Sequence, residues 1–280
     1  MAETPAPPQK GPLIYRQSIW TRITHWVWAV ALFFLLLSGL QIFNAHPALY
    51  IGEESGFEYS NAILTMQTGN LNGRRAGITT FWGRQYDTTG IFGLSSQDGV
   101  PTSRGFPEWA TIPSVRDLAT GRVVHFAAAW VFVGTLAIWL LASLANRHFW
   151  ADIVPKLADW RRLGRDIGDH LRLRFHHRRK YNALQKISYA VVLLIFFPVM
   201  ILTGLAMSPG MDAAWPWLLE IFGGRQTART IHFATMVLLV AFFIVHIVMV
   251  VAAGPINELR SMITGWYRAD PGEDEKDMHR

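Results

Sequence analysis

Long stretches without charged side chains divide this chain into four apolar segments and their polar connections. Each segment runs for more than 20 residues without Asp, Glu, Lys or Arg, which is enough for a helix to cross the hydrocarbon core of a bilayer. None alternates between apolar and polar positions as a β-barrel strand does. The pattern predicts an all-α integral membrane protein, a four-transmembrane-helix bundle in one domain over 1–280, with spans at about 19–43, 122–146, 186–208 and 229–254.

The connections between these spans differ in character. The first, 44–121, is rich in glycine and aromatic residues, and it is too long for a passive tether, because long loops are usually functional. Between 152 and 175, apolar residues recur at helical spacing, which predicts an amphipathic helix on the membrane surface. The short 208–228 connection contains Trp215 and Trp217, which we expect to act as an aromatic anchor at the membrane interface.

Basic residues are distributed unevenly over the connections. The formal net charge is +6, and eleven Lys and Arg lie within 147–186, against six in the longer 44–122. By the positive-inside rule, we expect the 147–185 loop and both termini in the cytoplasm and the 44–121 loop on the opposite side of the membrane. The chain is then a multi-pass membrane protein. The charge indicates topology and contact with anionic membrane lipid, and no nucleic-acid partner is expected.

Cysteine is absent, which excludes disulfides, Cys-ligated iron–sulfur clusters and c-type haem attachment. A bound metal must then be held mainly by histidine, and four of the ten histidines lie inside spans: His25, His125, His232 and His246. An ionisable residue inside a span is by default a functional hypothesis. Zinc or non-haem iron would gather three or four ligands, often carboxylates, and these spans contain no Asp or Glu.

The four histidines match in depth by pairs. Because successive spans run in opposite directions, His125 and His232 lie near the outer surface and His25 near the inner surface. His246 follows His232 by 14 residues, which places it ~21 Å deeper on nearly the same helix face. Two imidazoles from different helices can hold one haem iron, so we expect an outer haem at His125/His232 and an inner haem at His25/His246. A histidine-lined channel or proton pathway is the alternative, and it does not explain the paired depths.

Cationic and small residues accompany these ligands. Arg22, Arg122 and Arg229 each precede a span histidine by three residues, one turn closer to water. They are candidates for binding haem propionates, with simple snorkelling as the alternative. Gly39 lies at the expected level of the outer haem and is a candidate for giving the macrocycle room. Gly134 could do the same, and ordinary helix packing is the alternative for both.

The histidine pattern, with Arg22-Ile-Thr-His25-Trp26 and the segment KYNALQK at 180–186, resembles the bacterial di-haem cytochrome b561 superfamily. More narrowly, it resembles the membrane cytochrome b subunits of formate dehydrogenase, nickel–iron hydrogenase and especially thiosulfate reductase. The resemblance implies two haem b groups and a quinone site at which Asn182 would contact the quinone. Leu184 departs from the formate dehydrogenase subunits, which have Gly there. From the residues alone, Asn182 is equally a candidate N-cap of the third span.

The resemblance also implies a function. Electrons would pass between a periplasmic redox subunit, a molybdopterin oxidoreductase or similar, and the membrane quinone pool, so the chain would need no catalytic residue of its own. The 44–121 loop would dock that partner or cap the outer haem. The alternative is a stand-alone cytochrome b561 that oxidises a small substrate such as superoxide, drawn in by Arg74, Arg75 and Arg225. A transporter or a purely structural anchor is a third hypothesis, and it predicts no haem.

Overall fold

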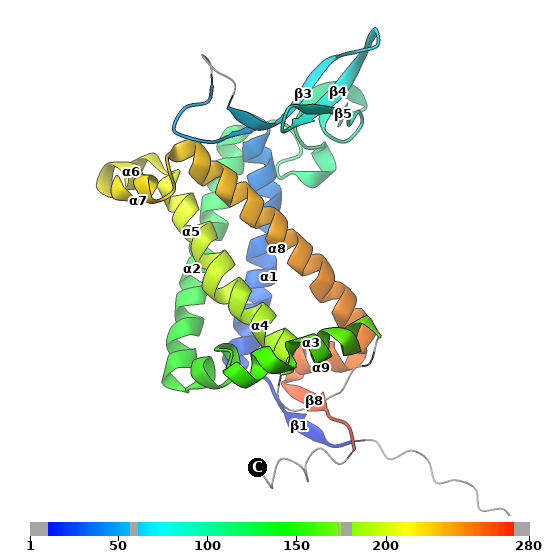
Figure 1. Cartoon of the computed structure of the whole chain (residues 1–280), viewed down its shortest axis with the longest axis vertical. Helices are drawn as coiled ribbons and strands as arrows, with labels where there is room; N and C mark the ends of the chain where they lie inside the picture. The colour runs from blue at the N-terminus through cyan, green and yellow to red at the C-terminus, as the bar shows by residue number, and fades with distance from the viewer. Residues whose placement is uncertain (1–10, 57–60, 173, 175–180, 272–280) are drawn as a thin grey trace, which may run out of the picture. The chain divides into compact units, whose positions relative to one another are not determined.

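The computed structural model describes residues 11–56, 61–172, 174 and 181–271. The chain divides into two compact units. Unit 1 comprises Met1–Trp26, Ala137–Ile195 and Val240–Arg280, and unit 2 comprises Val27–Leu136 and Phe196–Leu239. Each of the four long helical segments contributes to both units (Figure 1). Whether the chain acts as one domain over 1–280 stays a prediction.

Four helical segments are long and apolar enough to cross a membrane: α1 (Ile19–Phe43), α2 (Leu118–Ala145), the run Ala183–Ala206 and α8 (Arg225–Ala253). No residue in the most apolar stretch of α8 is buried within the protein. Phe243, Ile244 and Val248 of α8 are 57–59% exposed. An apolar surface of this extent is unusual in water but matches the hydrocarbon of a bilayer. The expected all-α membrane fold with four spans is confirmed.

The third span is helical but not regular. It consists of α4 (Ala183–Val191), a π-helical turn η3 (Val192–Phe196) and α5 (Phe197–Ala206). The wide turn comes directly before Pro198, which has no N–H to continue the α-helical ladder. π turns of this kind accommodate such an interruption inside a helix.

The 44–121 connection, treated as a loop in the sequence, folds largely into strands in unit 2. A four-stranded antiparallel sheet has the order β2-β3-β4-β5, and a separate hairpin pairs β6 with β7. The elements are β2 (Ala48–Tyr50), β3 (Ala62–Leu71), β4 (Arg74–Phe81), β5 (Arg84–Asp87), β6 (Gly93–Gln97), β7 (Val100–Arg104) and the short helix η1 (Glu108–Ala110).

Three two-residue turns define these hairpins. Asn72-Gly73, Trp82-Gly83 and Asp98-Gly99 have positive φ at both positions, between 48° and 81°. This is the type I′ geometry, whose twist matches that of the flanking strands and which favours Asn-Gly and Asp-Gly. Those two dipeptides are the signals from which the strands could have been predicted.

The strand region of unit 2 is fixed to the ends of α1 and α8. Phe43 of α1 packs with its ring centroid 4.8 Å from that of Phe233 in α8, in a cluster that includes buried Leu49 and Met66. Thr230 of α8 donates a hydrogen bond to the Tyr50 carbonyl at 2.7 Å. These contacts hold β2 and β3 directly on the ends of α1 and α8, and α8 carries His232 of unit 2.

Two short helices of unit 2, α6 (Pro209–Ala214) and α7 (Trp217–Ile221), connect α5 to α8. Leu218 is buried beside Ala206 and Ala228. Trp215 and Trp217 leave about half of their surface open, at 47% and 52% exposed. This exposure suits the expected aromatic anchor, because an interfacial tryptophan presents an apolar body outside the protein core.

Unit 1 joins the two ends of the described chain. Strand β1 (Leu13–Tyr15) pairs antiparallel with β8 (Trp266–Arg268), which follows α9 (Pro255–Thr264). A π turn, η2 (Phe149–Ile153), and the helix α3 (Leu157–Leu171) precede α4. The apolar residues Leu157, Trp160 and Ile167 of α3 are 68%, 54% and 40% exposed, as in an amphipathic helix on a membrane surface. The basic residues at 175–180 lie outside the described residues.

Candidate functional site

The four span histidines lie on three helices: His25 on α1, His125 on α2, and His232 and His246 on α8. The structure brings them together as two pairs. His25 and His246 belong to unit 1, and His125 and His232 belong to unit 2. Within each pair the imidazoles are close enough to interact electrostatically. Each unit therefore contains one candidate two-imidazole site.

The pair in unit 1 has a spacing that suits a shared iron. The ring centroids of His25 and His246 are 6.4 Å apart, with the ring planes tilted by 58°. A metal–nitrogen bond of about 2 Å on each side, with about 1 Å from each nitrogen to its ring centre, requires a separation of about 6 Å. The two rings stand at the distance needed to ligate one iron from opposite sides.

Neighbouring aromatic side chains and an unpaired nitrogen characterise this pair. The His246 ring stacks on Phe242 at 5.9 Å and 14°. The His25 ring meets Trp26 edge-on at 5.3 Å, and Trp26 is itself held by a hydrogen bond to the Met262 carbonyl. Nδ1 of His25 is buried and has no hydrogen-bond partner among the described residues. The 6.4 Å separation of the two rings lets one nitrogen of each imidazole reach a shared metal ion, so the residues present fit a bound metal group.

In unit 2, each histidine is held by a hydroxyl from another helix. Nδ1 of His125 lies 3.1 Å from Ser38 Oγ on α1. Nδ1 of His232 lies 2.9 Å from Thr203 Oγ1 on α5. The third span has no histidine, and Thr203 gives it a direct contact with this site. Sequence reasoning missed both hydroxyls, because the pairing of helix faces is not visible in a single sequence.

The hydrogen bonds of the two hydroxyls determine which ring nitrogen carries the proton. Ser38 Oγ donates its single proton to the Phe34 carbonyl at 2.5 Å, and Thr203 Oγ1 donates to the Val199 carbonyl at 2.6 Å. Each hydroxyl can then only accept from the imidazole, so Nδ1 is the protonated nitrogen. The lone pair is left on Nε2, which is the arrangement found in metal-ligating histidines with an outer hydrogen-bond partner.

Glycines stand next to these hydroxyls and make room for the imidazoles. A Cβ added at Gly39 would lie 3.2 Å from Cε1 of His125, and one at Gly204 would lie 3.5 Å from Cε1 of His232. The neighbour of Gly39 in the structure is thus a candidate ligand ring, whereas the sequence suggested the macrocycle itself. An added Cβ at Gly134 would meet no atom within 4 Å.

The three arginines that precede span histidines have different surroundings. Arg22 donates from Nη1 to the Ile263 carbonyl at 2.7 Å, while its Nε is buried without a partner among the described residues. Arg229 donates to the His46 carbonyl and lies 5.3 Å over the Phe43 ring. Arg122 is exposed and lies 5.7 Å over the Phe126 ring. Among the three, Arg22 retains a buried donor that a carboxylate such as a propionate could use.

Asn182 is the N-cap of α4. Its Oδ1 accepts from the Gln185 backbone N–H at 2.8 Å, and the Gln185 side chain accepts from the Asn182 N–H at 3.3 Å, which completes a capping box. Nδ2 lies 3.4 Å from His170 Nε2. The capping role expected as one of two alternatives is therefore present, and contact with a quinone stays a prediction.

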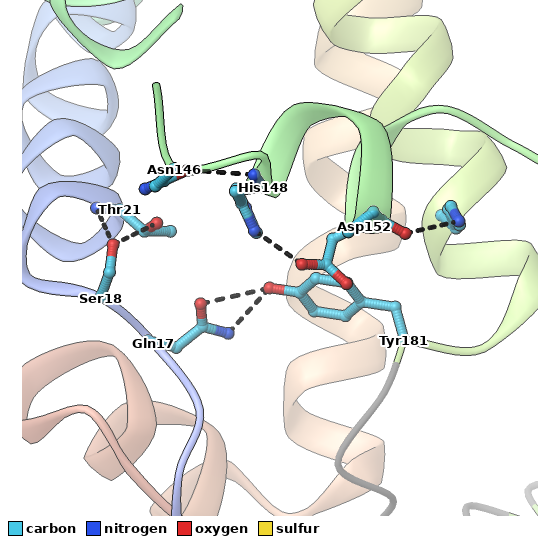
Figure 2. A network of polar contacts seen from close by, with 9 residues as sticks. Gln17, Ser18, Thr21, Asn146, His148, Asp152 and Tyr181 are labelled. Carbon is cyan, nitrogen blue, oxygen red and sulfur yellow. Dashed lines mark hydrogen bonds and ion pairs between the residues drawn. The ribbon is translucent and has the colours of Figure 1, made fainter. Parts of the chain in front are cut away.

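A polar network surrounds the start of α4 in unit 1 (Figure 2). The Gln17 amide donates to the Tyr181 hydroxyl at 2.9 Å, and Arg16 lies 4.9 Å over the Tyr181 ring. Burial raises the pKa of Tyr181. Nearby, His148 Nδ1 and Asp152 Oδ2 are 2.8 Å apart, and Figure 2 shows this pair beside the Tyr181 side chain.

Lys186 completes this network at the first turn of α4. It is only 7% exposed, donates to the Ala151 carbonyl at 3.0 Å and lies 3.4 Å from Asp159 Oδ2. A buried ammonium requires such partners. Protonatable groups and hydrogen-bond donors thus line the same segment whose sequence suggested a quinone site. None of the residues that build this network was a candidate from the sequence, although Tyr181 and Lys186 belong to the KYNALQK segment that suggested the quinone site.

Two of the three arginines that would attract a small substrate in the stand-alone alternative bind other groups of the protein. Arg74 forms an ion pair with Asp87 at 2.5 Å across the β4–β5 hairpin. Arg225 donates to the Met207 carbonyl at 2.9 Å. Arg75 is exposed at the start of β4. The three do not share a common partner in these contacts.

Two comparisons with known proteins bear on the site. The family model described as prokaryotic cytochrome b561 matches residues 16–265. That range contains all four span histidines and the dipeptides Ser38-Gly39 and Thr203-Gly204. The chain is also 26% identical over 233 residues to the "Putative protein-methionine-sulfoxide reductase subunit YedZ1" of Azospira oryzae, a match that covers 82% of this chain and 87% of the relative.

Proposed function

Because this chain belongs to the prokaryotic cytochrome b561 family, we propose that it is a di-haem subunit that links a periplasmic oxidoreductase to the membrane quinone pool. Membership makes the chain a multi-pass membrane protein that binds haem b and transfers electrons. The haem count, the quinone and the identity of the partner are the parts that we add. The periplasmic position of the 44–121 region and the cytoplasmic position of both termini, in the bacterial inner membrane, belong to the same proposal.

The observation that carries the proposal is the grouping of four histidines into two pairs. The 6.4 Å centroid separation of His25 and His246 fits a shared iron. In unit 2, the Nδ1 hydrogen bonds of His125 and His232 leave both Nε2 atoms available. Haem iron with two imidazole ligands accepts and releases one electron. The chain's own part is to hold the ligands, exclude water from them and place Arg22 as a cation near the pair in unit 1.

A partner protein is supported by the relative, whose name describes it as a subunit of a reductase. For this chain we infer a periplasmic redox subunit of the molybdopterin type, as the resemblance to thiosulfate reductase cytochromes implies. The strand region supplies a surface for it. Trp82, at the β4–β5 turn, is 73% exposed and Trp109, in η1, is 78% exposed, and exposed aromatic residues are common anchors at protein interfaces.

A quinone site is proposed at the start of α4. Gln17, Tyr181 and Lys186 supply hydrogen-bonding and protonatable groups there, and quinone chemistry exchanges protons as well as electrons. Asn182 is held in place by its capping box, which keeps its Nδ2 on the side of His170. The residues of this region orient a bound quinone headgroup and exchange protons with it.

The function is tested on the purified full-length protein in detergent. We expect a short-chain quinol to reduce the haem, followed at the α-band of the spectrum, and a molybdenum-containing subunit to co-purify in stoichiometric amount by metal analysis. Trp82→Ser and Trp109→Ser should weaken that association about tenfold. Trp160→Ser, at a 54% exposed position in α3, is the matched control and should leave it unchanged. Superoxide oxidation by the chain without any partner would favour the stand-alone alternative.

A further inference from the structure

The two histidines of unit 2 are held in the same way by two different helices. On α1, the dipeptide Ser38-Gly39 supplies a hydroxyl to Nδ1 of His125 and open space to its ring. On α5, Thr203-Gly204 does the same for His232. We propose that Ser38 and Thr203 are positioning residues that fix the ligand tautomers of the haem in unit 2 and lower its midpoint potential. This inference rests on the proposed function, since it requires a haem at that pair.

The first step of the argument is the direction of the hydrogen bond. The hydroxyl protons are committed to the carbonyls of Phe34 and Val199, one turn back in the same helices. A hydroxyl that donates to a carbonyl becomes a better acceptor, because hydrogen bonds in a chain polarise one another. The Nδ1–H groups of His125 and His232 are therefore the donors, and the Nε2 lone pairs are directed away from the hydroxyls.

The second step is the effect on the iron. An imidazole that donates from Nδ1 to a fixed acceptor is a more basic ligand through Nε2. A more basic ligand stabilises the higher charge of ferric iron more than ferrous iron, so the midpoint potential falls.

The third step is the contrast with unit 1. Nδ1 of His25 is buried and has no hydrogen-bond partner among the described residues. The ring of His246 packs on Phe242. The hydroxyls therefore act on one of the two sites only, and they separate the two midpoint potentials from each other.

The glycines explain why a hydroxyl can reach each ligand. An added Cβ would stand 3.2 Å from the His125 ring at Gly39 and 3.5 Å from the His232 ring at Gly204. Because helix faces can approach closely where a side chain is absent, the ring lies over the glycine and its Nδ1 falls beside the preceding hydroxyl. The need for glycine is strict at Gly39, where the 3.2 Å contact is tight, while the 3.5 Å contact at Gly204 is an ordinary van der Waals distance.

The test is a potentiometric titration of the purified full-length holoprotein, followed at the haem α-band. The component assigned to unit 2 is the one that His125→Ala removes. We expect Ser38→Ala and Thr203→Val each to raise its midpoint, changing its reduced-to-oxidised ratio at fixed potential two- to tenfold. At 59 mV per tenfold for a one-electron couple, this is about 20–60 mV. The midpoint of the other haem should not move.

Thr135→Val is the matched control. Thr135 Oγ1 also donates to a carbonyl one turn back, that of Val131, but accepts from the Trp28 indole instead of from a ligand. The same chemical change in a helix of the same unit should leave both midpoints at the wild-type value. The variants Ser38→Thr and Thr203→Ser change the size of the side chain but keep its hydroxyl. They should keep the wild-type midpoint, which distinguishes the effect of the hydroxyl from the effect of side-chain size.

Each outcome decides the proposal. Two retained haems with unshifted midpoints in Ser38→Ala and Thr203→Val would overturn it. If these variants lose the haem, Ser38→Thr and Thr203→Ser decide: retention of haem with the wild-type midpoint supports the hydroxyl role, and loss or an equal shift contradicts it. A wild-type protein with fewer than two haems would instead contradict the proposed function, and the inference would fall with it for that separate reason.

Discussion

The imidazole rings of His25 and His246 lie 6.4 Å apart between centroids, although 221 positions separate them in the sequence. Two rings at this distance leave room for one metal ion with a bond of about 2 Å to each. The contact joins the first turns of α1 to the last turns of α8. It provides the most direct geometric support for a haem held between two spans.

Replacing Arg22 should change the haem of unit 1 and leave the other unaffected. Its guanidinium has a buried Nε without a partner among the described residues, and a nearby cation stabilises the less positive, reduced iron. We expect Arg22→Gln to lower the midpoint potential of that haem, with a two- to tenfold change in the reduced-to-oxidised ratio, or about 20–60 mV.

Arg122→Gln is the control for this prediction. Arg122 also stands three residues before a span histidine, but its side chain is exposed, so screening by water should leave both midpoints nearly unchanged. Equal shifts in the two variants would indicate a general effect of net charge and would remove the special role of Arg22. Redox titration of both proteins under the same conditions gives the answer.

The two glycines beside the imidazoles should be sensitive to size in a graded manner. Gly39→Ala places a Cβ 3.2 Å from the His125 ring, which is tighter than the 3.5 Å at Gly204→Ala. The contact at Gly204 is an ordinary van der Waals distance, whereas the one at Gly39 is overpacked, and overpacking costs about 1–3 kcal/mol. We expect Gly39→Ala to lose more haem than Gly204→Ala on purification, measured as haem per protein.

Gly134→Ala is the matched change in α2. An added Cβ there meets no atom within 4 Å, and alanine is favoured over glycine in a helix by about 0.5–1 kcal/mol. Haem content should stay at the wild-type level and thermal stability should not fall. Haem loss equal to that of Gly39→Ala would show that the packing around the imidazoles is not the cause.

Asn182 can be separated into its two candidate roles. Asn182→Ala removes the N-cap of α4 and should destabilise the protein by about 1 kcal/mol. Asn182→Ser keeps a capping oxygen but loses the Nδ2 group that points toward His170. If the quinone contact is real, Asn182→Ser should keep the wild-type melting temperature and raise the KM for quinol. A wild-type KM in Asn182→Ser would assign the residue to capping alone.

A pH-dependent contribution to stability is expected from His46. Its Nε2 lies 3.1 Å from the Tyr50 hydroxyl, and burial, followed by the charge of Arg229, lowers the pKa of its imidazole below 6.5. The unfolded chain then binds more protons than the folded one as the pH falls through 6.5, so stability falls over that range and is fully present above it. His46→Gln should flatten this dependence in melting temperatures measured between pH 5 and 8. An unchanged slope would exclude His46 as its source.

The sequence predicts the four spans and the pairing of their histidines, because span length and helical periodicity are local properties. The 14-residue spacing of His232 and His246, multiplied by the rise of a helix, gives their expected difference in depth within the membrane. The strands of 44–121 were missed, since their evidence lies in short turn signals such as Asn72-Gly73 within a segment of mixed composition. Ser38 and Thr203 were not identifiable, because their role depends on which helix faces meet.

The three arginines that precede span histidines also show that tertiary contacts cannot be read from local sequence spacing. The spacing of three residues treats Arg22, Arg122 and Arg229 alike, yet the structure gives them three different environments. Arg229 donates to the carbonyl of His46, which lies just before β2, and no local signal anticipates that contact. Sequence patterns identify candidate groups here, and tertiary contacts decide which of them remain available.

The central claim is that four histidines hold two haems in the pairs His25/His246 and His125/His232. A pyridine haemochrome assay of the purified wild type, His246→Ala and His125→Ala tests it most directly. We predict two haem b per wild-type chain and one in each variant, with complementary losses in the reduced-minus-oxidised spectrum. A single haem in the wild type, or loss of the same spectral component in both variants, would contradict the account.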